Sequence, residues 1–284
     1  MIRPVRLLFS MAVGLLVVAV GVAAGAVTAE DARPPAASPA DNNFFVYLPL
    51  VFKAPNACEP IPGVSYTSLG VVVGYEPGKP PPENNPDYRL TLLGYNPVDK
   101  SKGLVYSGPS NDPNVPPQFT TIFDGQPTPP ILNTYQANGW DWENHRPIPT
   151  PWTNPEVSVI GLQTSPKTIV RVPDSGYDIQ YGYDAMVIYA SSQEIALKYT
   201  RDDRISYPDG NAGYTVYIVG ICVEPSLLSL YNQLNAAGRQ NLPVVRGEQP
   251  IGRAWGGEIA VAIRDNGTFL DPRECDGFWK GYCW

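Results

Sequence analysis

Proline restricts the fold of this chain more than any other residue, because 284 residues contain 32 prolines as well as 26 glycines. Proline lacks a backbone N–H donor and breaks the interior of a helix, so this density excludes long helices wherever it occurs. Between residues 64 and 172, short β-rich runs are separated by proline and glycine, a pattern typical of strands. These runs cover residues 70–74, 88–93, 156–162 and 168–172.

The second half of the chain continues this pattern. Alternating apolar runs predict further strands, each with one covered face, at residues 185–190, 194–200 and 213–219. Residues 224–238 predict a helix, because Pro225 stands at an early position and Gly238 provides a stop. We therefore expect a mainly β fold with one short helix, in which a β-rich module at residues 58–168 packs on a second domain at residues 169–284.

Residues 1–29 have the features of a secretory signal peptide. Arg3 and Arg6 precede an apolar run at residues 7–27, and residues 27–29 read V-T-A, which is a small-residue cleavage site. The apolar run is nearly long enough to span a bilayer, so an uncleaved N-terminal anchor is the alternative. No later segment has an apolar run of that length, and no membrane span is expected after cleavage.

Residues 30–57 are expected to link this leader to the folded body. Their first part is rich in proline and alanine, which predicts a semi-extended linker. Residues 44–52 are apolar, and we interpret them as an edge strand interrupted by Pro49. A docking strand is the alternative.

The formal net charge of −7 gives the chain an acidic surface that repels phosphate backbones, so nucleic acid is not an expected partner.

Four cysteines in an exported chain predict two disulfides, for which three connectivities exist. Cys275 and Cys283 bracket a short loop, so their mutual pairing is favoured, which leaves Cys58 to pair with Cys222. Pairing of Cys58 with the tail is the alternative. The chain has no C-x-x-C spacing, which argues against zinc-ribbon or redox chemistry.

Three motifs follow one another in the second half of the chain. Residues 174–178 read D-S-G-Y-D, residues 258–264 read E-I-A-V-A-I-R, and residues 266–272 read N-G-T-F-L-D-P. A glycine-containing turn at residues 245–252 precedes the second motif. The series resembles the lysostaphin-type (LytM-like) zinc metallopeptidases, which carry H-x-G-x-D, H-x-H-F-E-I-R and N-G-x-x-x-D-P in this order. The resemblance covers about residues 169–273.

The resemblance implies a LytM-like domain, a hybrid of β-sandwich and barrel with one short helix, at residues 169–284. The family's three zinc ligands fall on Asp174, Asp178 and Ala260 of this chain. Only Asp178 keeps the family's residue, whereas a zinc peptidase needs three protein ligands and an open position for water. The sequence therefore predicts no zinc at these positions.

The family's two catalytic histidines fall on Glu258 and Gln233, neither of which has an imidazole for proton transfer. The single histidine of the chain, His145, lies outside these motifs. One histidine cannot rebuild the site. The resemblance thus implies a peptidase-like fold without peptidase activity, and no catalytic residue is expected.

Asp174, Asp178 and Glu258 remain as carboxylates that would converge if this fold is present. No resident cofactor is predicted, although such an oxygen-rich group would suit calcium or magnesium. Separate solvated turns are the preferred interpretation of these carboxylates. The same carboxylates would suit the acid and base of a glycoside hydrolase, a reaction for which the sequence shows no family motif.

Trp140 and Trp142 lie between polar, proline-rich stretches, where a fully buried pair of large aromatic residues is not expected. Their flat faces can stack on sugar rings or peptide stems, so we expect them to form a ligand-facing patch. The alternative is that both rings belong to the core.

These features predict a protein that is secreted or held at the cell surface, and that has no catalytic activity of its own. We expect it to bind cell-wall glycan or peptide, or to regulate a wall hydrolase in the bacterial envelope. A structural or adhesive role at the surface is the first alternative, and a carboxylate-dependent hydrolase is the second. The expected partners are cell-wall glycan, cell-wall peptide or another envelope protein.

Overall fold

The computed structural model describes residues 58–106, 108, 112–125, 128–149, 154–207 and 212–283. The expected signal peptide, linker and apolar segment at residues 1–57 lie outside the described residues. Within the described part of the chain, no helix has both the length and the apolar character needed to cross a membrane.

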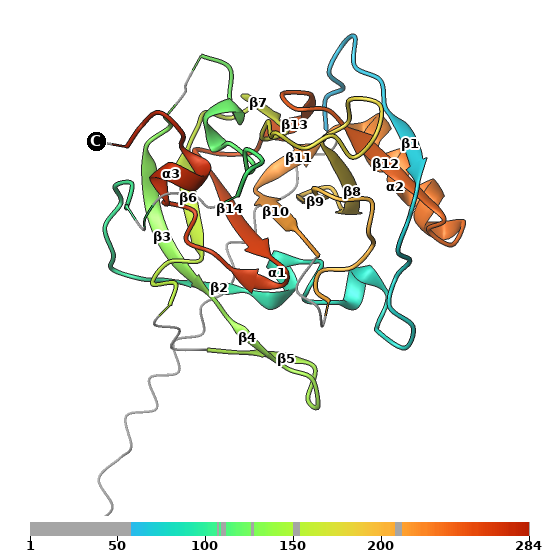
Figure 1. The fold of residues 1–284 in the computed structure, drawn as a ribbon, viewed down its shortest axis with the longest axis horizontal. Helices are drawn as coiled ribbons and strands as arrows, with labels where there is room; N and C mark the ends of the chain where they lie inside the picture. Colours follow the sequence, from blue (N-terminus) through green and yellow to red (C-terminus); the bar gives the residue numbers. More distant parts are fainter. Residues whose placement is uncertain are drawn as a thin grey trace, which may run out of the picture. The chain divides into compact units, whose positions relative to one another are not determined.

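Most described strands belong to one antiparallel sheet of ten strands (Figure 1). Its order is β1-β12-β8-β9-β10-β14-β6-β3-β2, and β15 pairs with β14. The strands are β1 (Thr67–Gly70), β2 (Tyr95–Pro97), β3 (Ile131–Ala137), β6 (Val159–Gln163), β8 (Ala185–Ala190), β9 (Glu194–Lys198), β10 (Tyr214–Val219), β12 (Asn241–Val245), β14 (Glu258–Asp265) and β15 (Thr268–Phe269). Strands from both sides of residue 169 pair in this sheet, so the expected domain boundary does not separate two sheets. The described residues, 58–283 with their gaps, belong to one compact unit.

Two smaller sheets complete the described strands. One has the order β11-β13-β7, with β7 (Ile169–Arg171), β11 (Ile221–Val223) and β13 (Pro250–Ala254). The other is a hairpin of β4 (Gly139–Asp141) and β5 (Arg146–Ile148), which projects from the body of the molecule (Figure 1). The described helices are η1 (Pro82–Asn84), α1 (Leu90–Leu93), η2 (Phe119–Thr121), α2 (Pro225–Ala236) and α3 (Cys275–Phe278). The predicted mainly β fold is confirmed, and α2 is the one helix of seven or more residues in the described part.

The helix expected at residues 224–238 corresponds to α2. The Glu224 side chain caps it by accepting hydrogen bonds from the backbone N–H groups of Ser226 and Leu227. Leu227 and Tyr231 are buried on the face that packs on β12 and β8. The chain leaves the helix through Gly238, whose φ of 90° is in the left-handed region that favours glycine.

The run at residues 88–93 is not a strand as predicted, because residues 90–93 form α1. Leu90 and Leu93 are both buried, and a spacing of three residues places them on the same side of a helical turn. Short apolar runs do not distinguish a strand from a buried helical turn, and tertiary packing decides here. The run at residues 70–74 also differs, since β1 ends at Gly70 and only an isolated bridge from Val73 to Asp202 follows.

The two faces of the central sheet differ in character. One face is apolar and fully buried, with side chains such as Ile195, Ile218 and Val261. The opposite face carries small residues and several polar ones. The strand register places Glu194, Val219, Ala260, Gly161 and Asn133 in one row on that face, across β9, β10, β14, β6 and β3.

Both expected disulfides are present, and the alternative pairing of Cys58 with the tail is excluded. Cys58 pairs with Cys222 at a Cα–Cα distance of 5.5 Å, and Cys275 pairs with Cys283 at 5.4 Å. The first bridge fastens the start of the described chain to β11. The second closes the segment that contains α3.

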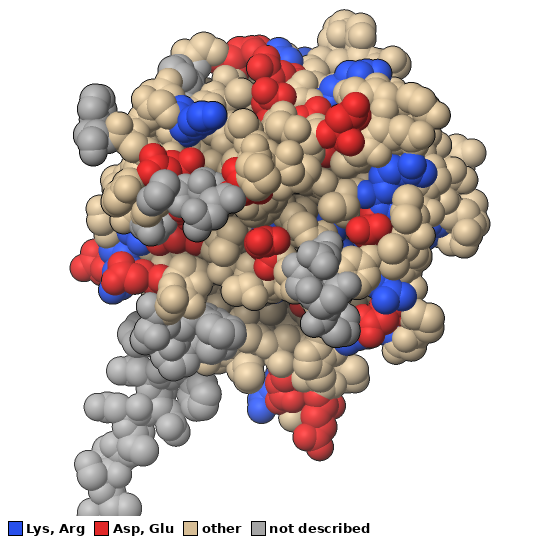
Figure 2. All heavy atoms as spheres, in the orientation of Figure 1, with Lys and Arg blue, Asp and Glu red and all other residues tan. Residues whose placement is uncertain are grey.

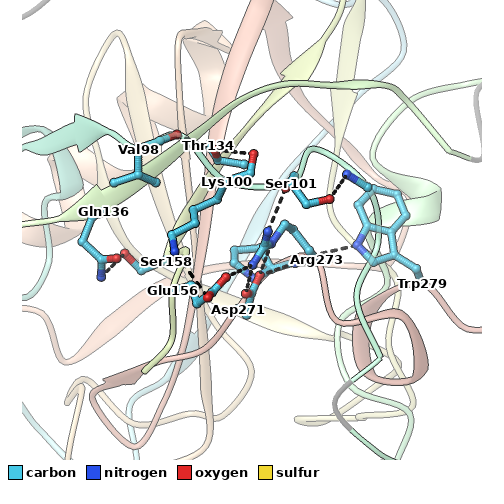
Figure 3. A network of polar contacts seen from close by, with 12 residues as sticks. Val98, Lys100, Ser101, Thr134, Gln136, Glu156, Ser158, Asp271, Arg273 and Trp279 are labelled. Carbon is cyan, nitrogen blue, oxygen red and sulfur yellow. Dashed lines mark hydrogen bonds and ion pairs between the residues drawn. The ribbon is translucent and has the colours of Figure 1, made fainter. Parts of the chain in front are cut away.

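A buried polar network fastens the C-terminal segment to the body (Figure 3). The guanidinium of Arg273 donates two hydrogen bonds to the carboxylate of Asp271, at 2.9 and 2.6 Å, and one to the backbone oxygen of Ser101 at 2.7 Å. The indole Nε1 of Trp279 donates to the backbone oxygen of Pro272 at 2.8 Å. The D-P pair of the third motif therefore has a structural role here, since a buried, doubly bonded arginine–carboxylate pair holds the tail in place.

Candidate functional site

Glu258 and Ala260 lie two residues apart on β14 and face the same side of the sheet. The Glu258 carboxylate accepts hydrogen bonds from the Tyr135 hydroxyl at 2.6 Å and from the side-chain amide of Asn133. It lies directly over Gly161, where a Cβ atom would come within 2.2 Å of Glu258 Oε1. Because Gly161 has no side chain, the Glu258 carboxylate can lie over this position.

Asp174 lies in a different group of residues, after the end of β7. Its carboxyl packs on Gly247, where a Cβ atom would come within 2.0 Å of Asp174 Oδ1. Beside it, Asp184 accepts hydrogen bonds from the backbone N–H of Gly247 at 2.7 Å and from the Ser175 hydroxyl at 2.8 Å. Burial raises the pKa of both carboxyls above their ordinary values. This group is an acidic, hydrogen-bonded turn that links the backbone around Ser175 to the backbone at Gly247.

The other two positions taken from the family resemblance are on the surface. Asp178 is exposed, and its carboxylate accepts a hydrogen bond from the backbone N–H of Gly182 at 3.0 Å. Gln233 is exposed on α2. His145 is also exposed, in the turn between β4 and β5.

Asp174, Asp178 and Glu258 do not meet as a metal-binding group in the described part of the chain. There, the one group of three side chains with potential metal ligands within reach of one another is Cys275, Asp276 and Cys283. Its two cysteines are bonded to each other, so they offer no thiolate. The convergence that the family resemblance implied for the three carboxylates is therefore absent from these residues.

Glu194 was not singled out from the sequence, although it is a fully buried carboxyl in the same row as Ala260. It accepts hydrogen bonds from Thr91, at 2.9 Å from the backbone N–H and 2.6 Å from the hydroxyl, and Arg89 Nε lies 3.6 Å away. Burial raises the pKa of Glu194. The sequence signal for this site was a glutamate that opens the strand predicted at residues 194–200.

Trp140 and Trp142 line a pocket of about 380 Å³. Trp140 is partly buried against the core, whereas Trp142 is 42% exposed. Their rings meet edge to face, with centroids 6.4 Å apart. The remaining lining includes a third aromatic ring, that of Phe269, and the side-chain amides of Gln136 and Asn138. The pocket thus combines flat apolar surfaces with groups able to donate and accept hydrogen bonds.

The β4–β5 hairpin positions the two tryptophans. Trp140 pairs with Pro147 in the strand register, and Asp141 closes the turn that follows. The Asp141 carboxylate accepts hydrogen bonds from the backbone N–H of Glu143 at 3.2 Å and from the side-chain amide of Asn144 at 2.7 Å. The hydrogen bonds from Asn144 lower the pKa of Asp141, so the turn is held by a charged acceptor.

Three charged residues also line this pocket. Lys79 Nζ lies 5.0 Å from the centroid of the Trp142 ring. Arg264 lies over the Phe269 ring at 4.0 Å and pairs with Asp87 at 2.9 Å. A smaller pocket of about 40 Å³ shares Lys79 and Asp87 with the larger one, so the two are adjacent.

Apart from Asp178 and Gln233 on the surface, the predicted site residues lie in three places: the Glu258 face of the sheet, the acidic turn around Asp174, and the tryptophan-lined pocket. Of these, the pocket has the volume and the lining of a ligand site. Lys79, Phe269 and Arg264 were not predicted, since the fold brings them to Trp142 from distant parts of the chain. No protein-family model matches this chain, and no curated protein and no solved structure matches it.

Proposed function

We propose that this protein is a secreted, non-catalytic protein of the bacterial cell envelope that binds cell-wall glycan or peptide. The pocket lined by Trp140 and Trp142 carries this proposal, because it offers two aromatic faces in a volume of about 380 Å³. Ligand pockets in proteins have volumes of roughly 300–1,000 Å³, and this pocket lies within that range. The similarity of residues 169–273 to LytM-like peptidases is part of the same proposal.

The lining suits a sugar or a peptide stem for a chemical reason. The apolar faces of sugar rings stack on tryptophan, and their hydroxyl groups need hydrogen-bond partners. The lining offers Asn138 for this, whose side-chain amide also bonds to Asn96 and to the backbone oxygen of Leu93. Trp142 is exposed enough to meet a polymer from outside, while Trp140 packs against the core and fixes the pocket wall. Binding to an insoluble wall polymer needs such an accessible aromatic face.

The non-catalytic part of the proposal is supported by the residues at the positions that resemble peptidase ligands and catalytic histidines. Glu258 is held by Tyr135 and Asn133, and Gln233 lies exposed on α2. Ala260 has no polar side-chain atom. No imidazole or thiolate stands at any of these positions, and the carboxylates among them do not come together as the three-ligand zinc site that a peptidase needs.

Co-sedimentation of residues 30–284, with the disulfides intact, on insoluble peptidoglycan tests this function. The wild-type protein is expected to pellet with the wall without releasing soluble muropeptides. Trp142→Ala should weaken binding by at least about tenfold, which corresponds to about 1.4 kcal/mol, because a central aromatic contact is lost. The matched control is Tyr181→Ala, which removes an aromatic side chain that is 71% exposed and does not line the pocket.

Each outcome of this experiment has a definite meaning. Release of muropeptides by the wild-type protein would show that it is a hydrolase. Pelleting that Trp142→Ala leaves unchanged would remove the pocket from the binding site. Failure of the wild-type protein to pellet would contradict wall binding and direct attention to envelope proteins as partners.

A further inference from the structure

The charges of the tryptophan-lined pocket differ from those of the molecule as a whole. The chain has a formal net charge of −7. On the face drawn in Figure 2, Lys and Arg side chains form separate small groups among Asp and Glu side chains. The charged residues that line the pocket are Lys79, Arg264 and Asp87, so its lining carries one more positive charge than negative charges. An acidic protein thus presents a locally cationic pocket.

The negative charge of Asp87 is already balanced inside the protein. Asp87 Oδ1 pairs with the Arg264 guanidinium at 2.9 Å. Arg264 is buried, with a residue exposure of 6%. The backbone of Asp87 is also held, since its N–H donates to the Asn85 side chain at 2.9 Å and its carbonyl accepts from the Tyr217 hydroxyl at 2.6 Å. This ion pair is part of the wall of the pocket, and it leaves Lys79 as the uncompensated charge.

Lys79 has no carboxylate within 4.0 Å among the residues that the structure describes. Its Nζ lies over the Trp142 ring instead, at 5.0 Å from the centroid. The smaller pocket that shares Lys79 adds one acidic residue and one basic residue, Glu76 and Arg204, so it does not alter this balance. An ammonium group beside an exposed aromatic face offers charge and stacking to the same ligand.

Building on the proposed wall binding, we infer that the pocket selects a ligand that carries a carboxylate, with Lys79 pairing the carboxylate while Trp142 stacks on the adjoining ring or chain. The carboxylates of a bacterial cell wall come from two sources, the acidic substituents of the glycan and the peptide stems. Both present the same group to Lys79. Three hydrogen-bond donors on an ammonium group suit a carboxylate at this position.

The test compares native peptidoglycan with peptidoglycan whose carboxylates have been converted to amides by carbodiimide and ammonium chloride. This treatment removes the charge and keeps the polymer. Amidation should weaken wild-type binding about three- to tenfold, which is the range for one charge-assisted contact at a partly exposed site. Lys79→Gln should weaken binding to native wall by a similar factor and should no longer distinguish the two walls.

Two control variants complete the experiment. Lys102→Gln removes an exposed lysine that does not line the pocket, so this variant should still respond to amidation as the wild type does. Lys79→Arg keeps the charge and should keep most of that response. Equal thermal unfolding midpoints for the four proteins would exclude misfolding as the cause of weaker binding.

The outcomes separate this inference from wall binding itself. Equal wild-type binding to native and amidated walls would overturn the inference and leave wall binding intact. A Lys79→Gln protein that still distinguishes the two walls would overturn the role of Lys79. A wild-type protein that binds neither wall would overturn both. The source of the carboxylate is then found by tryptophan-fluorescence titrations with free stem peptides and, separately, with glycan strands released by an amidase. Because the amidase exposes carboxylates on the glycan that are amide-linked in the intact wall, the strands are titrated before and after these new carboxylates are amidated.

Discussion

Lys198 places an amino group inside the protein. Its side chain is fully buried in β9, and Nζ donates hydrogen bonds to the backbone oxygen of Gly213 at 3.0 Å and to the Thr215 hydroxyl at 3.4 Å. Burial lowers the pKa of Lys198 to about 7, partly opposed by the negative charges of Asp202 and Asp265. The unfolded chain keeps the ordinary, higher pKa of a lysine.

The pH dependence of stability follows from this difference. Between about pH 7 and pH 9 the unfolded chain binds a proton at Lys198 that the folded chain does not. The free energy of unfolding should therefore rise with pH, by up to about 1.4 kcal/mol per pH unit from this group. Below about pH 7 both states are protonated and this slope disappears. Urea unfolding of the wild type and of Lys198→Met at pH 7, 8 and 9 checks this, and parallel curves for the two proteins would contradict it.

At the same scale, only part of the candidate site could be predicted from the sequence. Trp140 and Trp142 stand out because their neighbours are polar and rich in proline. Lys79 and Phe269 do not, because an exposed lysine and a single phenylalanine are common anywhere in a chain. Both residues line the pocket only because the fold brings distant parts of the chain together, which no local pattern encodes.

At the scale of elements, the cap of α2 has a measurable effect. Glu224 Oε2 accepts hydrogen bonds from the backbone N–H of Ser226 at 2.8 Å and of Leu227 at 3.0 Å. Glu224→Ala removes the acceptor and should lower the free energy of unfolding by about 1 kcal/mol. Glu224→Gln keeps a carbonyl acceptor and should lose less. Urea denaturation of both variants tests this ordering, and equal losses would show that the charge of Glu224, rather than its hydrogen bonds, stabilises the helix.

Elements with a strong pattern were predictable, and those with a short or mixed pattern were not. The runs at residues 185–190 and 194–200 became β8 and β9, as predicted. The prediction that only one face of each is covered is wrong, because all residues of both strands are buried. The run at residues 88–93 contains α1 instead, where Leu90 and Leu93 pack against the protein interior and Thr91 bonds to Glu194. The β4–β5 hairpin has a proline in one strand and a polar turn, so its sequence resembles that of a loop.

At the scale of the whole molecule, the Cys58–Cys222 bridge constrains the unfolded chain most, because it joins residues 164 positions apart, whereas Cys275 and Cys283 are 8 apart. Replacing Cys58 and Cys222 by serine should lower the free energy of unfolding by about 2–5 kcal/mol, and the same change at Cys275 and Cys283 should cost less. Urea denaturation of the two double variants compares them directly. The reverse order would indicate that the unfolded chain keeps structure near the first bridge.

The extent of the sheet could not be predicted, although its strands largely could. Sequence patterns indicate which residues form strands but not which strands pair, and the pairing of β14 with β6 joins the two halves of the chain in one sheet. Pairing depends on side chains that meet across strands, such as Glu258 over Gly161. Such complementarity becomes visible only in three dimensions.

The β4–β5 hairpin forms a sheet of its own, and its turn contributes an exposed tryptophan to the pocket while the fully buried core residues lie in other elements. Under the proposed function, the exposed turn of this hairpin contacts the ligand without supplying a fully buried core residue. A library that randomises only residues 142–145 would leave those core side chains untouched. The hairpin could in this way be diversified, or exchanged for another, to give a family of binders on one constant scaffold.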